Sequence, residues 1–296
     1  MTGPAGRSLT GSSTETSDRT GVMDRARLDG VELEYQVVGS GKAVLLIPPG
    51  PLADGFLPFL SEEALAERYR LIQYHRRGQA GSSQATPPVS YAEQAADAAG
   101  LLSHLGVSQA HVVGHSTGAN VALQLALDRP EVVQTLALLE PWLTASPSWS
   151  AFFEQAGPSM EAYGSGEKGA AMAGLISLAS GLEWETARAV IDDYVPGSVA
   201  QAIKDADTFC GVDLPALGAW EFGSEDAAAV SQPVLSVLGA DTGQLFVEGA
   251  ALLRSWLPTV EDLTVEGVGH LLQIQRPGPV ASGIAEFFGR HTVTVD

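Results

Sequence analysis

Apolar and polar positions alternate near the N-terminal end of the chain. Every second residue from Val31 to Val37 is apolar, and polar or charged side chains stand between them. A period of two predicts a strand over 31–38 that buries one face. The segment 25–28 precedes this strand across Asp29-Gly30, a dipeptide that favours a tight turn, so the two segments predict a β-hairpin.

Beyond this hairpin, short apolar runs alternate with longer amphipathic stretches. The apolar runs predict buried strands, and the amphipathic stretches predict helices. The expected strands cover 43–47, 71–74, 110–113, 133–139, 233–238 and 262–265. The expected helices cover 60–69, 91–105, 119–127, 246–256 and 280–288. This alternation predicts the α/β class, with a mostly parallel central sheet flanked by helices on both faces.

The pattern changes between residues 142 and 231, where helical segments rich in alanine and glycine replace the alternation. We interpret 142–231 as a helical cap inserted into a core that is formed by 23–141 and 232–296. Residues 1–22 are mostly Gly, Ser, Thr and charged side chains, with almost nothing to bury. This segment is therefore predicted to be a disordered tail.

The composition narrows the class of protein. The 296 residues are 45% hydrophobic, which supplies a full core for one large domain with an insertion. The formal net charge of -19 disfavours nucleic acid and anionic membrane surfaces as partners. The one cysteine, Cys210, allows no internal disulfide. No apolar run approaches the roughly 20 residues of a membrane span, and no signal-peptide pattern is present, so we expect a cytoplasmic protein.

A serine between two glycines carries the main chemical signal. The segment Gly114-His115-Ser116-Thr117-Gly118 follows a predicted strand and precedes a predicted helix. In such a nucleophile elbow, G-x-S-x-G, a strained turn pushes the serine hydroxyl toward substrate. A Cβ at either glycine would clash, because the neighbouring strand and helix pass too close. The amide of Thr117 then points at a developing oxyanion.

Three segments carry a resemblance to a known family: the elbow, the turn 74–78 (Tyr-His-Arg-Arg-Gly) and Gly267-Val268-Gly269-His270. The chain resembles the α/β-hydrolase superfamily over about 31–290. The resemblance implies a Ser-His-acid triad, no cofactor, and acyl chemistry on esters, lactones, amides or thioesters. Haloalkane dehalogenases and epoxide hydrolases in this superfamily attack with an aspartate at the elbow. A serine there points instead to an acyl-enzyme. No His, Cys and Asp cluster has metal-ligand spacing, so no metal is expected.

Two members of the triad are predicted from the elbow and from the order along the chain. Ser116 is the predicted nucleophile, and a serine hydroxyl needs a base within hydrogen-bond reach. His270 is the predicted base, because its glycine-flanked loop follows the last strand and can reach back over the strand ends. His115 is expected to point away and pack beside the elbow, and His75 to be structural or pocket-lining.

The acid has two candidates. In most relatives the acid follows the strand after the cap, three residues past a glycine. Here that glycine is Gly239, so the position is occupied by Thr242, and Asp241 lies one residue before it. Glu140 follows the strand after the elbow helix, a position that carries the acid in haloalkane dehalogenases and zearalenone-type lactone hydrolases. A carboxylate there is costly to bury without a partner, and His270 is the evident one. We favour Glu140 and keep Asp241 as the alternative.

The oxyanion hole and the substrate pocket are predicted in the same way. The loop after the first buried strand reads Pro49-Gly50-Pro51, and Pro51 has no amide hydrogen. Gly50 is therefore the predicted second donor beside Thr117. Four of the five tryptophans fall in the cap, where such chains line an apolar pocket. The predicted pocket residues are Trp142, Trp184 and Trp220.

The function follows from these assignments. The cap carries far more acidic than basic residues, which disfavours anionic substrates. The sequence predicts a serine hydrolase that cleaves a neutral, hydrophobic carboxylic ester or lactone through an acyl-enzyme. A carbon–carbon bond hydrolase, an acyltransferase or a cofactor-free perhydrolase would use the same triad. A ligand-binding module on a hydrolase fold is a further alternative, against which the complete triad argues.

Overall fold

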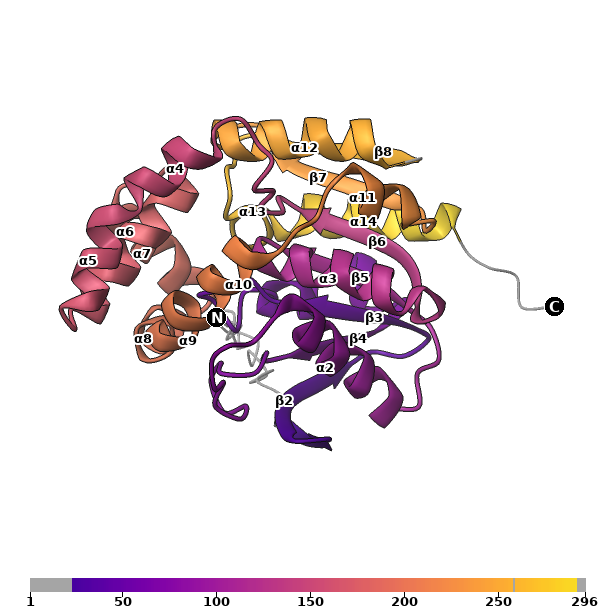
Figure 1. Cartoon of the computed structure of the whole chain (residues 1–296). Coiled ribbons are helices and arrows are strands. Elements are labelled where there is room, and N and C mark those ends of the chain that lie inside the picture. Colours follow the sequence, from indigo (N-terminus) through magenta and orange to yellow (C-terminus); the bar gives the residue numbers. More distant parts are fainter. Residues whose placement is uncertain (1–22, 258, 292–296) are drawn as a thin grey trace, which may run out of the picture.

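An eight-stranded sheet forms the centre of the computed structural model, which describes residues 23–257 and 259–291. The strand order is β1-β2-β4-β3-β5-β6-β7-β8 (Figure 1). The pairs β1–β2 and β2–β4 are antiparallel, and all other neighbours are parallel. The strands are β1 (Asp24–Leu28), β2 (Val31–Val38), β3 (Lys42–Ile47), β4 (Tyr69–Tyr74), β5 (Ala110–His115), β6 (Val133–Leu139), β7 (Val234–Gly239) and β8 (Val260–Val265).

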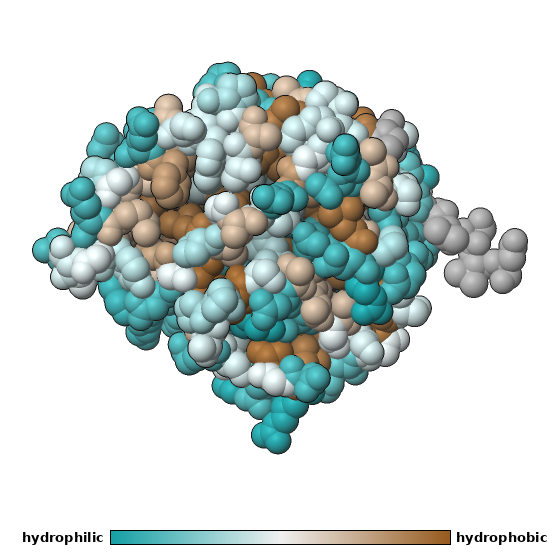
Figure 2. Space-filling view, viewed as in Figure 1, coloured by the Kyte–Doolittle hydropathy of each residue, from teal (hydrophilic) through white to brown (hydrophobic). Residues whose placement is uncertain are grey.

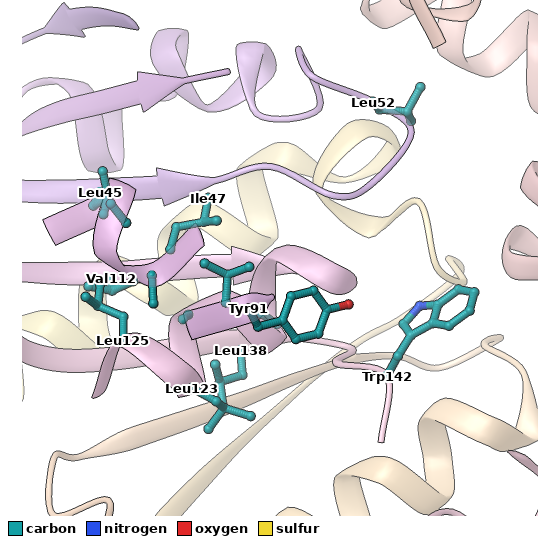
Figure 3. Close-up of a cluster of buried hydrophobic side chains, with 14 of the residues drawn as sticks. Leu45, Ile47, Leu52, Tyr91, Val112, Leu123, Leu125, Leu138 and Trp142 are labelled. Carbon is teal, nitrogen blue, oxygen red and sulfur yellow. The ribbon is translucent and has the colours of Figure 1, made fainter. Parts of the chain in front are cut away.

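Helices cover both faces of this sheet, as the alternation of strands and helices predicts. One face packs against α2 (Tyr91–His104), α3 (Thr117–Asp128) and α12 (Gln244–Trp256). The other packs against α1 (Glu63–Ala66) and α14 (Pro277–Arg290). Successive residues of β3 enter the two apolar clusters in turn, which explains why this central strand is apolar from Ala43 to Ile47. Figure 3 shows part of the first cluster, including Leu45, Val112, Leu123 and Leu138.

Most predicted elements are confirmed, and one helix is wrong. The hairpin turns at Gly30, whose φ is 77°, a conformation that suits glycine. The helix expected over 60–69 is instead a 3-10 turn (Leu57–Ser61) followed by the four-residue α1. Extended backbone at Glu62 separates the two, and Tyr69 already pairs with Lys42 of β3. A short helix before α14, α13 (Leu272–Gln275), was not predicted.

A helical insertion lies between β6 and β7, so the chain leaves the sheet at the carboxyl end of β6. In Figure 1 the helices α4 to α9 gather on one side of the sheet. The insertion contains α4 (Trp149–Gln155), α5 (Gly157–Gly164), α6 (Lys168–Ser180), α7 (Trp184–Tyr194), α8 (Ser198–Lys204), α9 (Ala206–Thr208), the π-helix η3 (Phe209–Asp213), α10 (Leu214–Ala219) and α11 (Ser224–Ala229). The predicted disordered tail, 1–22, lies outside the described residues.

The surface is mixed in polarity. Figure 2 shows hydrophilic side chains spread over the face in view, with small hydrophobic patches between them. Within 23–257 and 259–291, no helix combines the length and the apolar character that a membrane crossing needs.

Candidate active site

Ser116 lies at the sharp turn between β5 and α3. Its φ of 55° and ψ of -128° are strained for a residue with a side chain. The structure confirms why both flanking positions are glycine. A Cβ at Gly114 would lie 2.5 Å from the Gly118 carbonyl oxygen, and one at Gly118 would lie 2.4 Å from the carbonyl oxygens of Ile47 and Pro48. The elbow therefore packs directly on the end of β3.

His270 lies on the loop after β8 and is buried. Its Nδ1 is 2.6 Å from Oε2 of Glu140, so Nδ1 carries the proton that this carboxylate accepts. In the neutral ring this leaves Nε2 as the nitrogen that can accept a proton, which is what a general base requires. The ring of Phe246 stacks on the imidazole with 4.0 Å between centroids and an interplanar angle of 13°. These two contacts fix the orientation of the ring.

Glu140 follows the last residue of β6 and is 2% exposed. Besides His270, its carboxylate accepts hydrogen bonds from the Gly239 amide at 2.8 Å and from Thr242 Oγ1 at 2.9 Å. Three donors offset the cost of burying the charge. Its φ of 47° is a second strained conformation at the site. The residue is thus held by β7 and by the loop after β7.

The two acid candidates lie in different environments. Glu140 is in hydrogen-bond contact with His270, whereas the side chain of Asp241 is exposed to solvent. The Asp241 amide donates to the Val268 carbonyl oxygen at 3.0 Å, which fixes the turn that carries it. Thr242, in the position that usually carries the acid, donates its hydroxyl to Glu140 instead.

His115 supports the histidine loop. Its Nε2 donates to the His270 carbonyl oxygen at 2.9 Å, and its Nδ1 accepts from Gln273 Nε2 at 2.9 Å. Burial, reinforced by the neighbouring His270, holds the pKa of His115 well below its usual value, so the ring is neutral. Gln273 lies on the unpredicted helix α13. No short-range pattern links it to His115, which is 158 residues away.

His75 belongs to a separate hydrogen-bond network from Ser116, His270 and Glu140. Its two ring nitrogens are 3.2 Å from Glu34 Oε2 and 2.9 Å from Asp54 Oδ1. The ring therefore joins β2 to the loop before the 3-10 turn, which is a structural role.

The side chain of the one cysteine, Cys210, is buried. Burial raises the pKa of its thiol to about 11, so the thiol is protonated near neutral pH.

A small cavity lies over Ser116. The centre of a water molecule can occupy only about 30 Å³ of it, room for one or two waters. Apart from Ser116, Ser180, His115 and His270, the side chains that line it are apolar. They are Pro49, Pro51, Leu52, Trp142, Leu175, Ile176, Ala179, Phe209 and Leu271. Most of the roof therefore comes from the cap, through α6 and η3.

Of the three predicted pocket tryptophans, Trp142 borders this cavity. Asn120 holds its backbone: Asn120 Nδ2 donates to the Trp142 carbonyl oxygen at 2.7 Å, and the Trp142 amide donates back at 3.1 Å. Trp184 and Trp220 are not among the residues that border the cavity. Trp220 donates its indole N–H to Gln124 and stacks on Phe222, which places it at a separate groove between the cap and α2.

The two predicted oxyanion donors lie close together, because a Cβ on Gly50 would be 3.1 Å from Thr117 Oγ1. Thr117 is the first residue of α3, where a backbone amide has no acceptor within its own helix. The amide of Gly50 donates to no acceptor within the described part of the chain. The Gly50 loop is held from behind, because Gln79 Nε2 donates to the carbonyl oxygens of Pro49 and Gly50 at 3.0 and 2.6 Å. Sequence reasoning did not identify Gln79.

No group of three His, Cys, Asp or Glu side chains in the described residues is placed to hold a metal ion. The arrangement that remains is a serine and a buried histidine at one apolar cavity, with a buried carboxylate bonded to the far side of that histidine. These groups can carry out nucleophilic attack with proton transfer.

Curated relatives match parts of the chain. "Putative carbamate hydrolase RutD" of Caulobacter vibrioides is 34% identical over 129 residues, 42% of this chain and 47% of that protein. The chain thus matches about half the length of this relative. The protein of the same name from Klebsiella pneumoniae is 29% identical over 241 residues, 79% of this chain and 86% of that protein.

A solved structure and a family model also match most of the chain. The enol-lactonase of Burkholderia xenovorans has a TM-score of 0.73 at 17% identity, over 90% of this chain and all of that one. At that identity the likeness shows the fold alone. The model described as alpha/beta hydrolase fold matches residues 43–277, most of the chain and all the candidate site residues. The chain therefore belongs to the α/β-hydrolase family.

Proposed function

We propose that the chain is a serine hydrolase that cleaves neutral, apolar carboxylic esters or lactones, with Ser116, His270 and Glu140 as its triad. The observation that carries the proposal is the 2.6 Å hydrogen bond between Glu140 and His270, a histidine that borders the same cavity as the strained Ser116. A buried carboxylate with three donors and a histidine fixed in one tautomer is costly to maintain without a use.

The reaction would proceed in two halves. Ser116 Oγ attacks the substrate carbonyl carbon while His270 Nε2 takes the hydroxyl proton, and Glu140 stabilises the imidazolium. The carbonyl oxygen becomes an oxyanion facing the amides of Thr117 and Gly50. The bond to the leaving alkoxide breaks as His270 returns the proton to it, which leaves an acyl-enzyme. Water, deprotonated by His270, then releases the acid and restores Ser116.

The cavity lining supports a neutral substrate. None of its thirteen lining residues is Asp, Glu, Lys or Arg. A substrate carboxylate would therefore lose its hydration with no cation to pair with, at a cost of several kcal/mol. The relatives named as putative carbamate hydrolases add carbamates, which are also neutral carbonyl compounds, to the substrates worth testing.

The test compares matched esters. p-Nitrophenyl butyrate, dihydrocoumarin and a phenyl carbamate are neutral, and p-nitrophenyl hemisuccinate is the anionic match of the butyrate. We expect hydrolysis of at least one neutral substrate, and a kcat/KM at least about 100-fold lower for the hemisuccinate. Ser116→Ala should lower kcat by about a thousandfold or more. Equal rates for Ser116→Ala and wild type, or a preference for the anionic ester, would refute the proposal.

A further inference from the structure

A buried ion pair joins the cap to the core near Gly50 and Thr117, the two predicted oxyanion donors. Arg76 follows β4, and Asp213 ends the π-helix η3 of the cap. Their bond is bidentate, with Nη2–Oδ2 at 2.7 Å and Nη1–Oδ1 at 2.9 Å. The side chains are 2% and 1% exposed. Gln94 of α2 bonds to both partners. A planar guanidinium fork in this setting holds its carboxylate in one geometry.

Two further bonds fasten the same cap segment to the same turn. The amide of Ala80 donates to Asp205 Oδ2 at 2.9 Å, and Thr208 Oγ1 donates to the Gly78 carbonyl oxygen at 2.7 Å. A Cβ on Gly78 would lie 2.5 Å from that hydroxyl, so the approach needs glycine. The cap segment 205–213 is therefore bound along the turn 76–80. In Figure 1 this segment, between α8 and α10, lies where the cap meets the core.

The turn is in contact with both predicted oxyanion segments. Arg76 Nη2 donates to Thr117 Oγ1 at 3.3 Å. The Arg76 amide donates to Gln79 Oε1 at 3.1 Å, which orients the Gln79 amide group toward the two carbonyl oxygens of the Gly50 loop. Phe209, at the other end of η3, covers Gly50 so closely that a Cβ there would lie 2.3 Å from its ring. One end of the π-helix therefore reaches Thr117 through Asp213 and Arg76, and the other end packs on Gly50 through Phe209.

We propose that Arg76 and Asp213 are a positioning pair that sets the oxyanion donors Gly50 and Thr117 when the cap is docked. This inference rests on the proposed function. Without Asp213, the guanidinium is a buried charge lacking its main partner, and it must turn toward other acceptors or water. Its hold on Thr117 and, through the turn, on Gln79 then changes. The triad bond between His270 and Glu140 lies on other elements and is left in place.

The same turn supplies a matched control. Arg77 bonds to Asp97 of α2 through Nε–Oδ2 at 2.5 Å and Nη2–Oδ1 at 2.7 Å. This pair is also bidentate and largely buried, with side-chain exposures of 20% and 8%, yet it contacts neither Gly50 nor Thr117. Asp97→Asn therefore perturbs an ion pair of the turn without reaching the oxyanion segments.

The experiment measures kcat and KM for p-nitrophenyl butyrate, and the Ki of butylboronic acid, whose tetrahedral adduct with serine places an oxygen in the oxyanion site. We expect Asp213→Asn to lower kcat at least about tenfold, since one lost oxyanion donor costs about 10²–10³. KM should stay within about threefold, and the boronate Ki should rise by the same factor as kcat falls. Asp97→Asn should leave all three values within about threefold.

If Asp213→Asn does not fold, the double variant Arg76→Met with Asp213→Leu takes its place, because removing both charges restores packing without an unpaired ion. It should fold and keep a low kcat, whereas a return to the wild-type kcat overturns the inference. An active wild type with equal kcat for Asp213→Asn and Asp97→Asn also overturns it and leaves the proposed function standing. A wild type that hydrolyses no neutral ester overturns both.

Discussion

The hydroxyl of Thr242 offers a sharp test of how Glu140 is held. It donates to the same carboxylate oxygen, Oε2, that accepts from His270, and the bond length is 2.9 Å. Thr242→Val keeps the shape of the side chain and removes only this donor. The carboxylate then keeps two of its three hydrogen bonds, to His270 and to the Gly239 amide.

The expected loss follows from the charge and the burial of Glu140. A hydrogen bond to a charged group contributes about 1.5–3 kcal/mol. Because Glu140 is buried, water replaces the lost hydroxyl poorly, and the cost should fall within that range. We also expect kcat to fall about tenfold, since His270 is oriented by a carboxylate that is itself less firmly placed.

Urea unfolding at pH 7 measures the free energy of unfolding, and p-nitrophenyl butyrate hydrolysis measures kcat. Thr264→Val, on the exposed side of β8, is the matched control, and Thr242→Ser, which keeps the hydroxyl, should recover most of the loss. The reasoning is refuted if Thr242→Val is no less stable than Thr264→Val and retains the wild-type kcat.

Two further predictions concern the frame of the site. Burial lowers the pKa of His75, but the hydrogen bonds and charges of Asp54 and Glu34 outweigh it and raise this pKa above 6.5. Protonated His75 therefore stabilises the fold fully below about pH 6.5, and this stabilisation is lost as pH rises through the raised pKa. His75→Gln should lower the free energy of unfolding in urea more at pH 6 than at pH 9. An equal loss at both pH values would contradict this. Gly118→Ala places a Cβ 2.4 Å from carbonyl oxygens at the end of β3 and should displace the elbow. We expect kcat to fall by about 100-fold or more. A wild-type kcat would show that the elbow tolerates the added methyl group.

The fold was largely predictable because its signals are local. Apolar runs buried on both faces identify the parallel strands, and glycine marks the hairpin turn. The helix expected over 60–69 failed for a tertiary reason. Its pattern is continuous in sequence, but Tyr69 gains a strand partner in β3 and Glu62 adopts extended backbone. Strand pairing inside the sheet outweighs a weak helical pattern.

The site divides in the same way. The glycine spacing around Ser116 and before His270 is a local signal, and both residues border the cavity. The choice between Glu140 and Asp241 depends on where β6 and β7 end side by side, which no spacing reveals. Cap contacts are further out of reach, since Arg76 and Asp213 are 137 residues apart. Aromatic content alone also did not distinguish Trp142, which borders the cavity, from Trp220, which does not.

A comparison of Glu140→Gln with Asp241→Asn on one neutral ester measures most directly which carboxylate serves His270. Glutamine keeps the size of Glu140 but presents an amide where His270 Nδ1–H needs a carboxylate, which favours the wrong tautomer. We predict that Glu140→Gln lowers kcat by about 10⁴. Asp241→Asn changes an exposed position, so its kcat should stay within about threefold of the wild-type kcat. A larger fall for Asp241→Asn than for Glu140→Gln would contradict this prediction.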